Sequence, residues 1–267
     1  MNNIINNSLK IKDMVITLLL EVSEKIVLPK YKSLKNTEIK TKSNLNDFVT
    51  IADEKAEEYL SFELKKIVNN SFVIGEESVY KDESILNKLN DNRPIWIIDP
   101  IDGTSNFVSG DDKFYIIIAL VINNVTIMGW IHNPINSTTV WSSRGEGTWL
   151  DNNRLIITNS DKNLSNNKAA IYHKGLIDSK NKFNYIKYNG SAAHEYISLV
   201  KNDIQISCFS RLLPWDHAAG ILIHQEAGGY SALLDNSIYH PNCKKKDGIL
   251  SAPNIEIWRS VRSLMIL

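Results

Sequence analysis

Apolar residues recur at helical spacing in two segments near the start of the chain. From Ser8 to about Ser33 they return every three or four positions, and Pro29 is expected to end or bend this helix. A second helix is expected after Thr50, which suits the N-cap position, with Asp53 at the acidic position of a capping box. Both patterns predict amphipathic helices that pack one face against a core.

Short apolar segments of strand length follow, and they predict a mostly antiparallel sheet. The pair Asn123-Asn124 between two of them is typical of a tight hairpin turn. The expected strands are Phe72–Ile74, Ile95–Asp99, Phe114–Ile122, Val125–His132, Thr138–Ser142 and Gly147–Leu150. The first half of the chain is therefore expected to place helices on this sheet.

After about residue 152 the pattern changes to an alternation of strands and helices. The expected strands are Ala169–Tyr172, Ile204–Phe209 and Ile249–Ala252, and the expected helices are Ala192–Lys201, Asp216–Glu226 and Ile255–Met265. Such alternation indicates an α/β layer. We therefore expect an α/β (α+β) protein with a boundary near residue 150, which no flexible linker marks.

Composition and charge exclude several classes of protein. The 267 residues contain 30 Lys plus Arg and 30 Asp plus Glu, which argues against a nucleic-acid binder that relies on bulk charge. The longest apolar run, Tyr115–Ile122, is far shorter than the roughly 20 residues that span a bilayer. With no secretory signal visible and two cysteines, Cys208 and Cys243, the simplest prediction is a reduced, cytoplasmic location.

Acidic residues are concentrated where an expected strand ends, in the segment Trp96–Thr104. The apolar strand ends in Asp99, Pro100 is expected to stop the ladder, and Gly103 permits a tight turn. Such a turn can point Asp99 and Asp102 at one place, and hard cations such as Mg²⁺ prefer oxygen clusters of this kind. The alternative is a turn in which both side chains only cap local backbone amides.

Two further acidic motifs flank this segment. Glu76 and Glu77 directly follow the apolar Phe72–Ile74, and on extended backbone only one of them could face a shared site. A solvated loop is the alternative. Downstream, Asp216 is expected at the N-cap of a helix, where anions are favoured, although a purely capping aspartate is the commoner role. His217 is expected to pack rather than to bind a metal.

Taken in order, these motifs resemble the inositol monophosphatase family, a group of Mg²⁺-dependent, lithium-sensitive phosphatases. The match covers nearly the whole chain and runs through Asp47–Thr50 with Asp53, Gly75–Glu77, Asp99–Phe107, Gly190–Ala193, Trp215–Gly220 and Glu226–Gly229. The resemblance implies a layered α/β/α/β/α sandwich of the inositol monophosphatase and fructose-1,6-bisphosphatase type, commonly a homodimer. Residues 1–150 would carry the metal-binding motifs, and residues 151–267 would complete the substrate site.

The resemblance also implies metal ligands. Glu76 matches a ligand of the first metal, and Asp99 matches the carboxylate that bridges two metals. The backbone carbonyl of Ile101 matches another ligand, and Asp102 and Asp216 match ligands of the second metal. Two or three Mg²⁺ ions are expected, because so many crowded carboxylates repel one another unless cations neutralise them.

Catalytic and substrate-binding roles follow from the same resemblance. Thr104 matches the hydroxyl that orients and deprotonates the attacking water, supported by Asp53, so Glu76, Thr104 and Asp53 are the expected catalytic residues. Lys42 matches a flexible loop that brings in another metal or the substrate, and a solvated surface lysine is the alternative. The residues expected to contact substrate are Gly103, Thr104, Gly190, Ser191, Ala192, Arg211 and Asp216.

The substrate is expected to be a small metabolite phosphate. Animal family members carry a substrate-reading glutamate seven residues before the helix aspartate, and here that position is Phe209. Together with Arg211, this change predicts that inositol 1-phosphate is a poor substrate and that a second anionic group or an apolar face is favoured. Alternatives are histidinol phosphate, fructose 1,6-bisphosphate and 3′-phosphoadenosine 5′-phosphate. A regulatory or binding protein on the same scaffold is an alternative of another class.

Overall fold

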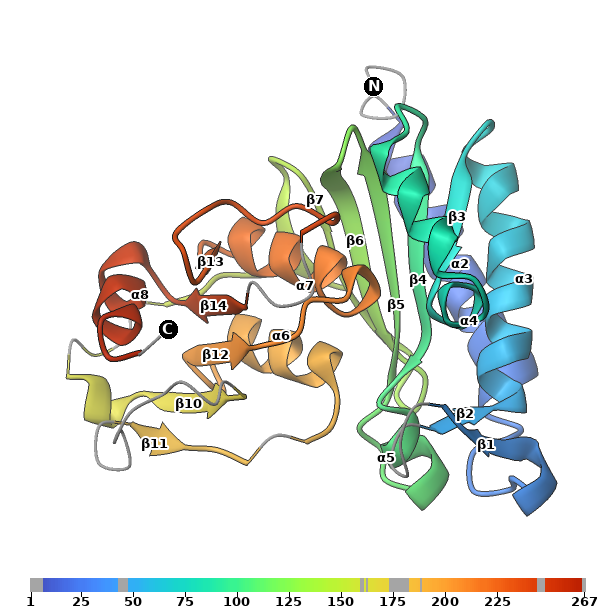
Figure 1. Ribbon diagram of the computed structural model, residues 1–267, viewed down its shortest axis with the longest axis horizontal. Helices are drawn as coiled ribbons and strands as arrows, with labels where there is room; N and C mark the ends of the chain where they lie inside the picture. The colour runs from blue at the N-terminus through green and yellow to red at the C-terminus, as the bar shows by residue number, and fades with distance from the viewer. Residues whose placement is uncertain are drawn as a thin grey trace.

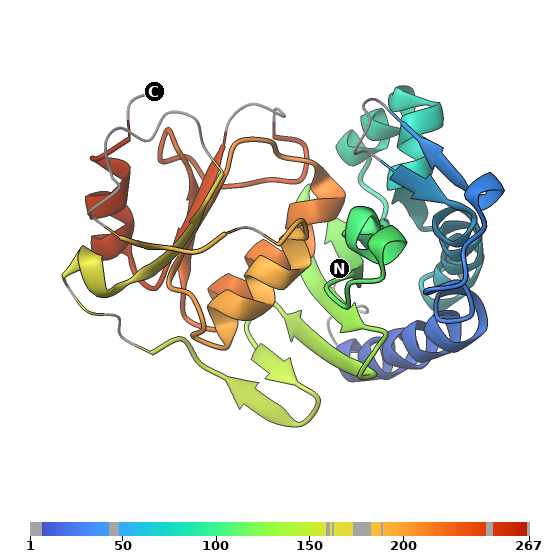
Figure 2. The same cartoon turned by 90° about the horizontal axis from the view of Figure 1, so that it is seen from below.

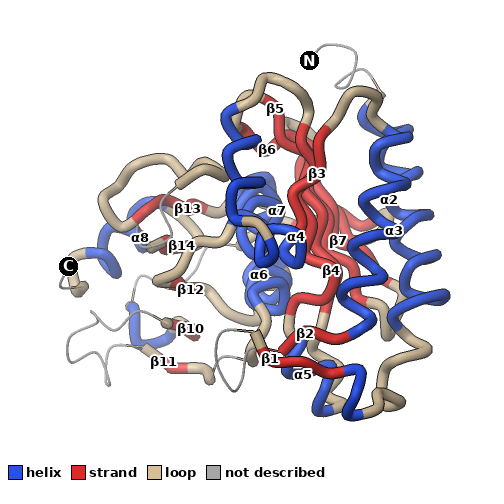
Figure 3. The backbone as a smooth tube through the Cα atoms, turned by 45° about the vertical axis from the view of Figure 1, so that its right-hand side comes forward, coloured by secondary structure: helices blue, strands red, loops and turns tan. Residues whose placement is uncertain are grey.

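The computed structural model describes residues 7–42, 48–158, 161, 163–172, 183–187, 189–243 and 248–265, and these form five layers. Helices α2 (Ser8–Val22) and α3 (Ile51–Ile67) lie side by side over the outer face of a large sheet (Figures 1 and 3). Helices α6 (Ala192–Val200) and α7 (Pro214–Glu226) separate that sheet from a smaller one, whose far face is covered by α8 (Ile255–Arg262) (Figures 1 and 2). The expected α/β/α/β/α sandwich is confirmed.

The large sheet has seven strands in chain order, which are β3 (Phe72–Gly75), β4 (Ile95–Asp102), β5 (Tyr115–Ile122), β6 (Val125–Asn133), β7 (Thr138–Ser143), β8 (Gly147–Leu150) and β9 (Asn153–Leu155). The pair β3 and β4 is parallel and the remaining pairs are antiparallel. Asn123 and Asn124 both have positive φ, 50° and 60°, as a two-residue hairpin turn requires. The expected strands and hairpin are confirmed.

One expectation for this sheet is wrong, because β4 does not end at Asp99. The strand continues to Asp102, which pairs with Tyr115 on β5, and the register shifts between Asp99 and Asp102. Pro100 cannot donate to the ladder, so the chain forms a bulge there and then pairs again. A bulge therefore lies where the sequence predicts that Pro100 ends the strand.

The smaller sheet has five strands in the order β11 (Asn184–Tyr185), β10 (Lys168–Ile171), β12 (Ile206–Phe209), β14 (Ile249–Ala252) and β13 (Tyr230–Leu233). Strand β10 is parallel to β11 and β12, whereas β14 is antiparallel to β12 and β13. This mixed sheet and its helices agree with the α/β layer expected for the second half of the chain.

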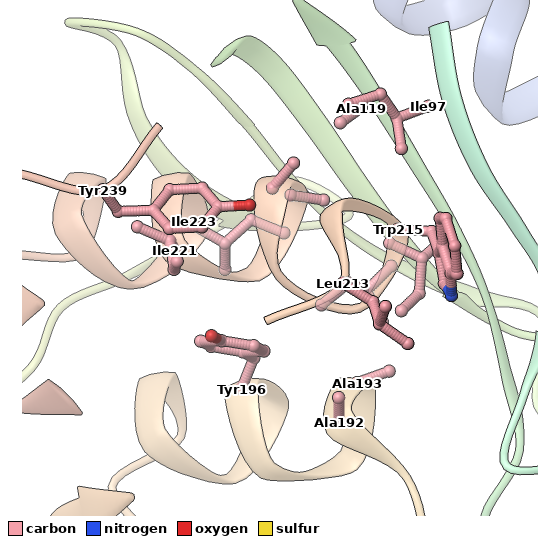
Figure 4. Close-up of a cluster of buried hydrophobic side chains, with 14 of the residues drawn as sticks. Ile97, Ala119, Ala192, Ala193, Tyr196, Leu213, Trp215, Ile221, Ile223 and Tyr239 are labelled. Atoms are coloured by element: carbon pink, nitrogen blue, oxygen red, sulfur yellow. The ribbon is translucent and has the colours of Figure 1, made fainter. Parts of the chain in front are cut away.

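The apolar core divides along the layers. Successive residues of β4 point to opposite faces, so Trp96 and Ile98 pack under α2 and α3 while Ile95 and Ile97 pack toward α6 and α7. Figure 4 shows the second of these clusters, in which Tyr196 of α6 faces α7. A third cluster lies between the smaller sheet and α8 around Trp258. None of the described helices is long and apolar enough to cross a membrane.

Small residues bring the middle layer close to its neighbours. A Cβ added at Gly220 of α7 would lie 2.1 Å from Cδ2 of Tyr196, and one added at Gly129 of β6 would lie 2.9 Å from Cα of Ala219. Helix α7 is therefore in van der Waals contact with α6 on one side and with the large sheet on the other. The expectation that Ala218, Ala219 and Gly220 permit close packing is confirmed.

Short helices and a small ribbon complete the fold. The N-terminal helix passes into a π-helical turn at Ser23–Val27, just before Pro29, and short 3₁₀ segments occupy Asn36–Glu38, Glu83–Asn90 and Leu164–Asn166. Two short helices, α4 (Glu76–Lys81) and α5 (Thr104–Ser109), follow β3 and β4, and strands β1 (Ile39–Thr41) and β2 (Phe48–Thr50) form an antiparallel ribbon. Helix α4 begins directly at the acidic strand end that was expected, whereas α5 begins only after β4 has continued to Asp102.

Candidate active site

Two buried aspartates and one partly buried aspartate lie together beside the bulge of β4. Asp99 and Asp102 come from β4 and Asp216 comes from α7, and one carboxylate oxygen of each lies within 4.8 Å of the other two. The expected N-cap position of Asp216 is wrong, because α7 begins at Pro214 and Leu213 is its N-cap. Proline fits the first helical position well, which moves Asp216 into the first turn and toward β4.

Burial and mutual repulsion disfavour the charged forms of these aspartates. The pKa values of Asp99 and Asp216 lie well above the ordinary range because both side chains are buried and face other carboxylates, Glu76 among them. Burial also raises the pKa of Asp102 to about 6. A crowded, buried set of oxygen donors with this electrostatic imbalance fits a hard divalent cation such as Mg²⁺.

Asp102 is held in place by the start of α6. Its carboxylate accepts hydrogen bonds from Ser191 Oγ at 2.5 Å and from the backbone amides of Ala192 and Ala193 at 3.2 and 2.8 Å. Gly190 has a φ of +77°, which favours glycine at the turn into this helix. Gly190, Ser191 and Ala192 were expected to contact the substrate. They do not line the cavity that the described residues form, because they lie behind Asp102.

Glu76 and Glu77 are the first residues of α4, not part of an extended strand. Lys42 Nζ lies 2.8 Å from Oε1 of Glu76 and 2.7 Å from Oε1 of Glu77, and only 3% of the lysine side chain is exposed. Burial alone would lower the pKa of Lys42, but the two glutamates raise it above its ordinary value. The two alternatives, a solvated loop at Glu76 and Glu77 and a solvated surface lysine at Lys42, are therefore excluded.

Glu57 of α3 explains why α4 begins at this point. Its carboxylate accepts hydrogen bonds from the backbone amides of Glu77 at 2.7 Å and Ser78 at 2.8 Å, and also from the Ser78 hydroxyl. A carboxylate at this position satisfies amides that the first turn of a helix leaves unpaired. A Cβ at Gly75 would lie 2.2 Å from Cδ of Glu57, so the close approach requires glycine there. Glu57 was not predicted, because no local pattern places an acid twenty residues earlier in the chain against this turn.

A hydroxyl and a buried carboxylate flank the aspartate cluster. Thr104 Oγ1 lies 3.2 Å from Oδ1 of Asp53 and 3.0 Å from the carbonyl oxygen of Ile101. The other carboxylate oxygen of Asp53 accepts from the backbone amide of Thr50 at 2.8 Å and from its hydroxyl at 2.6 Å, which confirms the expected capping box. Burial raises the pKa of Asp53 to about 7. Asp47, from the same motif, lies outside the described residues.

These groups line a cavity of about 390 Å³. Its lining contains Lys42, Glu76, Val79, Tyr80, Glu83, Asp99, Ile101, Asp102, Gly103, Thr104, Arg211, Leu213, Trp215 and Asp216. All the expected metal ligands are therefore brought to one cavity. Val79, Tyr80, Leu213 and Trp215 were not predicted to line the site, although Tyr80 follows Glu76 by one helical turn and would have been found had α4 been recognised as a helix.

The two residues expected to set specificity lie in different places. Phe209 is 7% exposed and packs between the rings of Tyr196 and His217, at centroid distances of 5.9 and 4.9 Å, outside the cavity lining. Arg211 is exposed and lines the cavity. Its carbonyl oxygen accepts from Nε2 of His217 at 2.9 Å, so Nδ1 of that ring accepts from the Tyr196 hydroxyl at 3.0 Å. His217 thus packs and fixes the Arg211 segment, as expected, while Phe209 is excluded as a substrate contact.

Comparison with known proteins agrees with this geometry. The model of the inositol monophosphatase family matches residues 11–262. A fructose-1,6-bisphosphatase/inositol-1-monophosphatase of Thermotoga maritima is 29% identical over 80% of this chain and 81% of its own length, and the Nus factor SuhB of Vibrio cholerae is 30% identical over 74% and 76%. A solved structure described as an IMPase/NADP phosphatase complexed with Mg²⁺ and phosphate superimposes with a TM-score of 0.81 at 19% identity, covering 96% of this chain and 94% of that one.

Proposed function

The chain belongs to the inositol monophosphatase family and is a phosphoric monoester hydrolase, and on this premise we propose that it hydrolyses a small metabolite phosphate by Mg²⁺-dependent attack of water. The observation that carries the proposal is the convergence of Asp99, Asp102 and Asp216 in the cavity. Asp99 and Asp102 come from β4 and Asp216 comes from α7, and burial opposes their ionisation, a cost that a bound cation would remove.

The proposed metal ligands are the carboxylates of Glu76, Asp99, Asp102 and Asp216 and the carbonyl oxygen of Ile101, all of which line the cavity. Two or three Mg²⁺ ions, when bound, would neutralise these carboxylates and lower the pKa of a coordinated water so that hydroxide is available near neutral pH. Lys42 forms ion pairs with both Glu76 and Glu77, so its ammonium would keep Glu77 as a partner if a cation took up the Glu76 carboxylate.

Thr104 and Asp53 are proposed to handle the proton of the attacking water. The threonine hydroxyl can donate to Oδ1 of Asp53, at 3.2 Å, and accept a hydrogen bond from a water on its other side. A pKa of about 7 makes the buried Asp53 carboxylate a usable proton acceptor near neutral pH. The backbone amides of Gly103 and Thr104, in the turn that follows β4, are proposed to hold phosphate oxygens.

Arg211 is proposed to contact a second anionic group of the substrate. It is an exposed arginine in the cavity lining, and its backbone is fixed by the hydrogen bond to His217. A planar guanidinium with five donors suits a carboxylate or a second phosphate better than a neutral polyol. Inositol 1-phosphate is therefore expected to be a secondary substrate.

The decisive experiment measures phosphate release from a panel of metabolite monophosphates with Mg²⁺ and with a chelator. The panel includes inositol 1-phosphate, fructose 1,6-bisphosphate, histidinol phosphate and 3′-phosphoadenosine 5′-phosphate, in wild type and Arg211→Ala. We expect Mg²⁺-dependent turnover, inhibition by millimolar lithium, and a rise in KM with Arg211→Ala that is confined to substrates with a second anion. Full activity in the chelator would refute the metal mechanism, and an equal effect on all substrates would refute the role of Arg211.

A regulatory or binding role is the alternative of another class, since one relative is described as a Nus factor. The complete acid set in the cavity favours turnover, because a scaffold that only binds a partner has no need to bury unneutralised carboxylates. Absence of phosphate release from the whole panel at any Mg²⁺ concentration would favour this alternative. We also propose a cytoplasmic homodimer, and sedimentation equilibrium would test the oligomeric state.

A further inference from the structure

Tyr80 gives the cavity an aromatic wall next to the acidic residues. We propose that its ring is the surface on which the organic part of the substrate binds, and that it favours phosphate monoesters carrying a flat, unsaturated ring, such as aryl or nucleoside phosphates, over polyol phosphates. The inference rests on the proposed phosphatase function and assigns a specificity-determining residue to that same site.

Helix geometry places Tyr80 beside the proposed metal ligands. Helix α4 begins at Glu76, and residues four positions apart lie on the same face of a helix. Glu76 and Tyr80 accordingly both line the cavity that contains Asp99, Asp102 and Asp216. A group bound next to Tyr80 would therefore be attached to a phosphate located at the acidic cluster.

The Tyr80 ring contacts Lys42 and is still available to a ligand. Nζ of Lys42 lies 5.6 Å from the centroid of the Tyr80 ring, and the same ammonium is paired with Glu76 and Glu77. This cation–π contact ties the orientation of the ring to the acidic residues. Nevertheless 55% of Tyr80 is exposed, so the ring has free surface that a ligand in the cavity can cover.

Three further apolar residues of the lining, Val79, Leu213 and Trp215, add apolar surface to the cavity that contains Tyr80. A cavity of about 390 Å³ lies in the range that holds a small organic ligand rather than a phosphate ion alone. A flat ring would gain stacking on Tyr80, whereas an inositol ring has no aromatic face to stack and would turn hydroxyl groups toward the apolar residues.

The test compares two substrates that differ in the flat ring, 1-naphthyl phosphate and glycerol 2-phosphate. Tyr80→Ala is expected to lower kcat/KM for 1-naphthyl phosphate by about tenfold, the scale of losing one aromatic stacking partner, and to change glycerol 2-phosphate by less than about twofold. Tyr80→Phe keeps the ring and should restore the wild-type preference. Phe62→Ala is the matched control, because Phe62 is also an exposed aromatic residue, 64% exposed, and lines a different groove on α3.

Adenosine 2′-monophosphate and ribose 5-phosphate form a second pair, which separates nucleoside from simple aryl recognition. An equal loss on ring-bearing and ring-free substrates in Tyr80→Ala, or the same loss in Tyr80→Phe, would overturn the assignment. If the wild-type protein releases phosphate from none of these compounds, the proposed function fails. In that case calorimetric binding of 1-naphthyl phosphate to wild type and Tyr80→Ala still tests the aromatic wall, and equal affinities would reject it.

Discussion

At the scale of single residues, Asp99 occupies the central position among the acids of the cavity. One of its oxygens lies within 4.8 Å of oxygens of both Asp102 and Asp216, and its Oδ1 also accepts from the backbone amide of Ile101 at 3.0 Å. Burial raises the pKa of Asp99, and so do the other three proposed carboxylate ligands, Glu76, Asp102 and Asp216. The proposed cations would therefore depend strongly on this one charge.

Replacing Asp99 by asparagine keeps the shape of the side chain and removes its charge. We expect kcat to fall by roughly 10³-fold or more, the scale of losing a principal electrostatic contribution to catalysis. Steady-state kinetics at saturating Mg²⁺ measures this loss, and Asp112→Asn is the control because Asp112 is an exposed aspartate. A loss of less than tenfold in a folded Asp99→Asn protein would show that this carboxylate is not central.

Thr104 is expected to act on the nucleophile and not on the organic part of the substrate. Its hydroxyl reaches Asp53 and the carbonyl of Ile101, so Thr104→Ala removes the link between water and base. We expect kcat to fall by about 10²-fold while KM changes little, with substantial recovery in Thr104→Ser. A raised KM with unchanged kcat would assign the hydroxyl to substrate binding instead.

The sequence predicts most residues of the site but not all of its walls. Asp99, Asp102 and Thr104 are found because they stand in one local motif, and Glu76 and Asp216 because their motifs resemble those of a known family. Tyr80 escapes prediction because its position depends on α4, which begins only where Glu57 supplies partners for its amides. The prediction that Phe209 contacts the substrate is wrong for the converse reason, because the side chain packs against Tyr196 and His217 and lies outside the cavity.

Elements with regular patterns are the part of the fold that the sequence predicts best. Helix α3 with its capping box and the hairpin at Asn123 follow from local chemistry. Strands β1, β2, β9 and β11 are not predicted, because segments of two or three residues carry too little periodic signal to be distinguished from loops. The four-residue strand β13 is not predicted either. The bulge in β4 likewise depends on the partner strand β5, which a local pattern around Pro100 does not contain.

The contact between α6 and α7 offers a test at the scale of elements. Alanine is intrinsically better than glycine inside a helix by about 1 kcal/mol, so Gly220→Ala would be stabilising if space allowed. The added Cβ would instead lie 2.1 Å from Tyr196, and we expect the free energy of unfolding to fall by about 1–3 kcal/mol. Urea denaturation measures the change.

A double-mutant cycle with Tyr196→Leu identifies the cause of that loss. The smaller leucine removes the ring that the new methyl group would meet, so the effect of Gly220→Ala should shrink or change sign in the Tyr196→Leu background. Equal effects in both backgrounds would show that the loss does not arise from the contact between these two helices.

At the scale of the whole molecule, five layers bring acids from distant parts of the chain into one buried region. The carboxylates come from α3, α4, β4 and α7, so the cavity exists only when both halves of the chain are folded together. Burial in such a region opposes the ionisation of the carboxyl groups. The stability of the folded protein must therefore depend on pH and on bound cations.

The last prediction concerns that dependence, and its sign follows from the pKa values. Burial raises the pKa of Asp53 and of Glu195 to about 7, and it also raises those of Asp99 and Asp216. Unfolded carboxyl groups titrate near pH 4, so between about pH 4 and 7 the folded state binds more protons than the unfolded state. These groups stabilise the protein fully below pH 4, and this contribution is lost as the pH rises through the folded pKa values.

Buried histidines act in the opposite direction over part of this range. Burial lowers the pKa of His132 and His217 to about 4 and that of His224 to about 3, so these rings favour folding increasingly as the pH rises toward about 6.5. Above about pH 7.5 they are neutral in both states. The window from about pH 7.5 to 9 therefore separates the carboxylates from these histidines.

Within that window we expect the metal-free protein to lose stability as the pH rises, and Mg²⁺ to restore it. The cation competes with protons for the same oxygens, so its stabilising effect should be larger at about pH 9 than at about pH 7.5. Thermal unfolding with chelator and with millimolar Mg²⁺ measures both effects, and Asp216→Asn should reduce each of them because it removes one of the clustered charges. Rising stability of the metal-free protein between about pH 7.5 and 9, or a Mg²⁺ effect that is independent of pH, would contradict the idea that the clustered acids hold a cation.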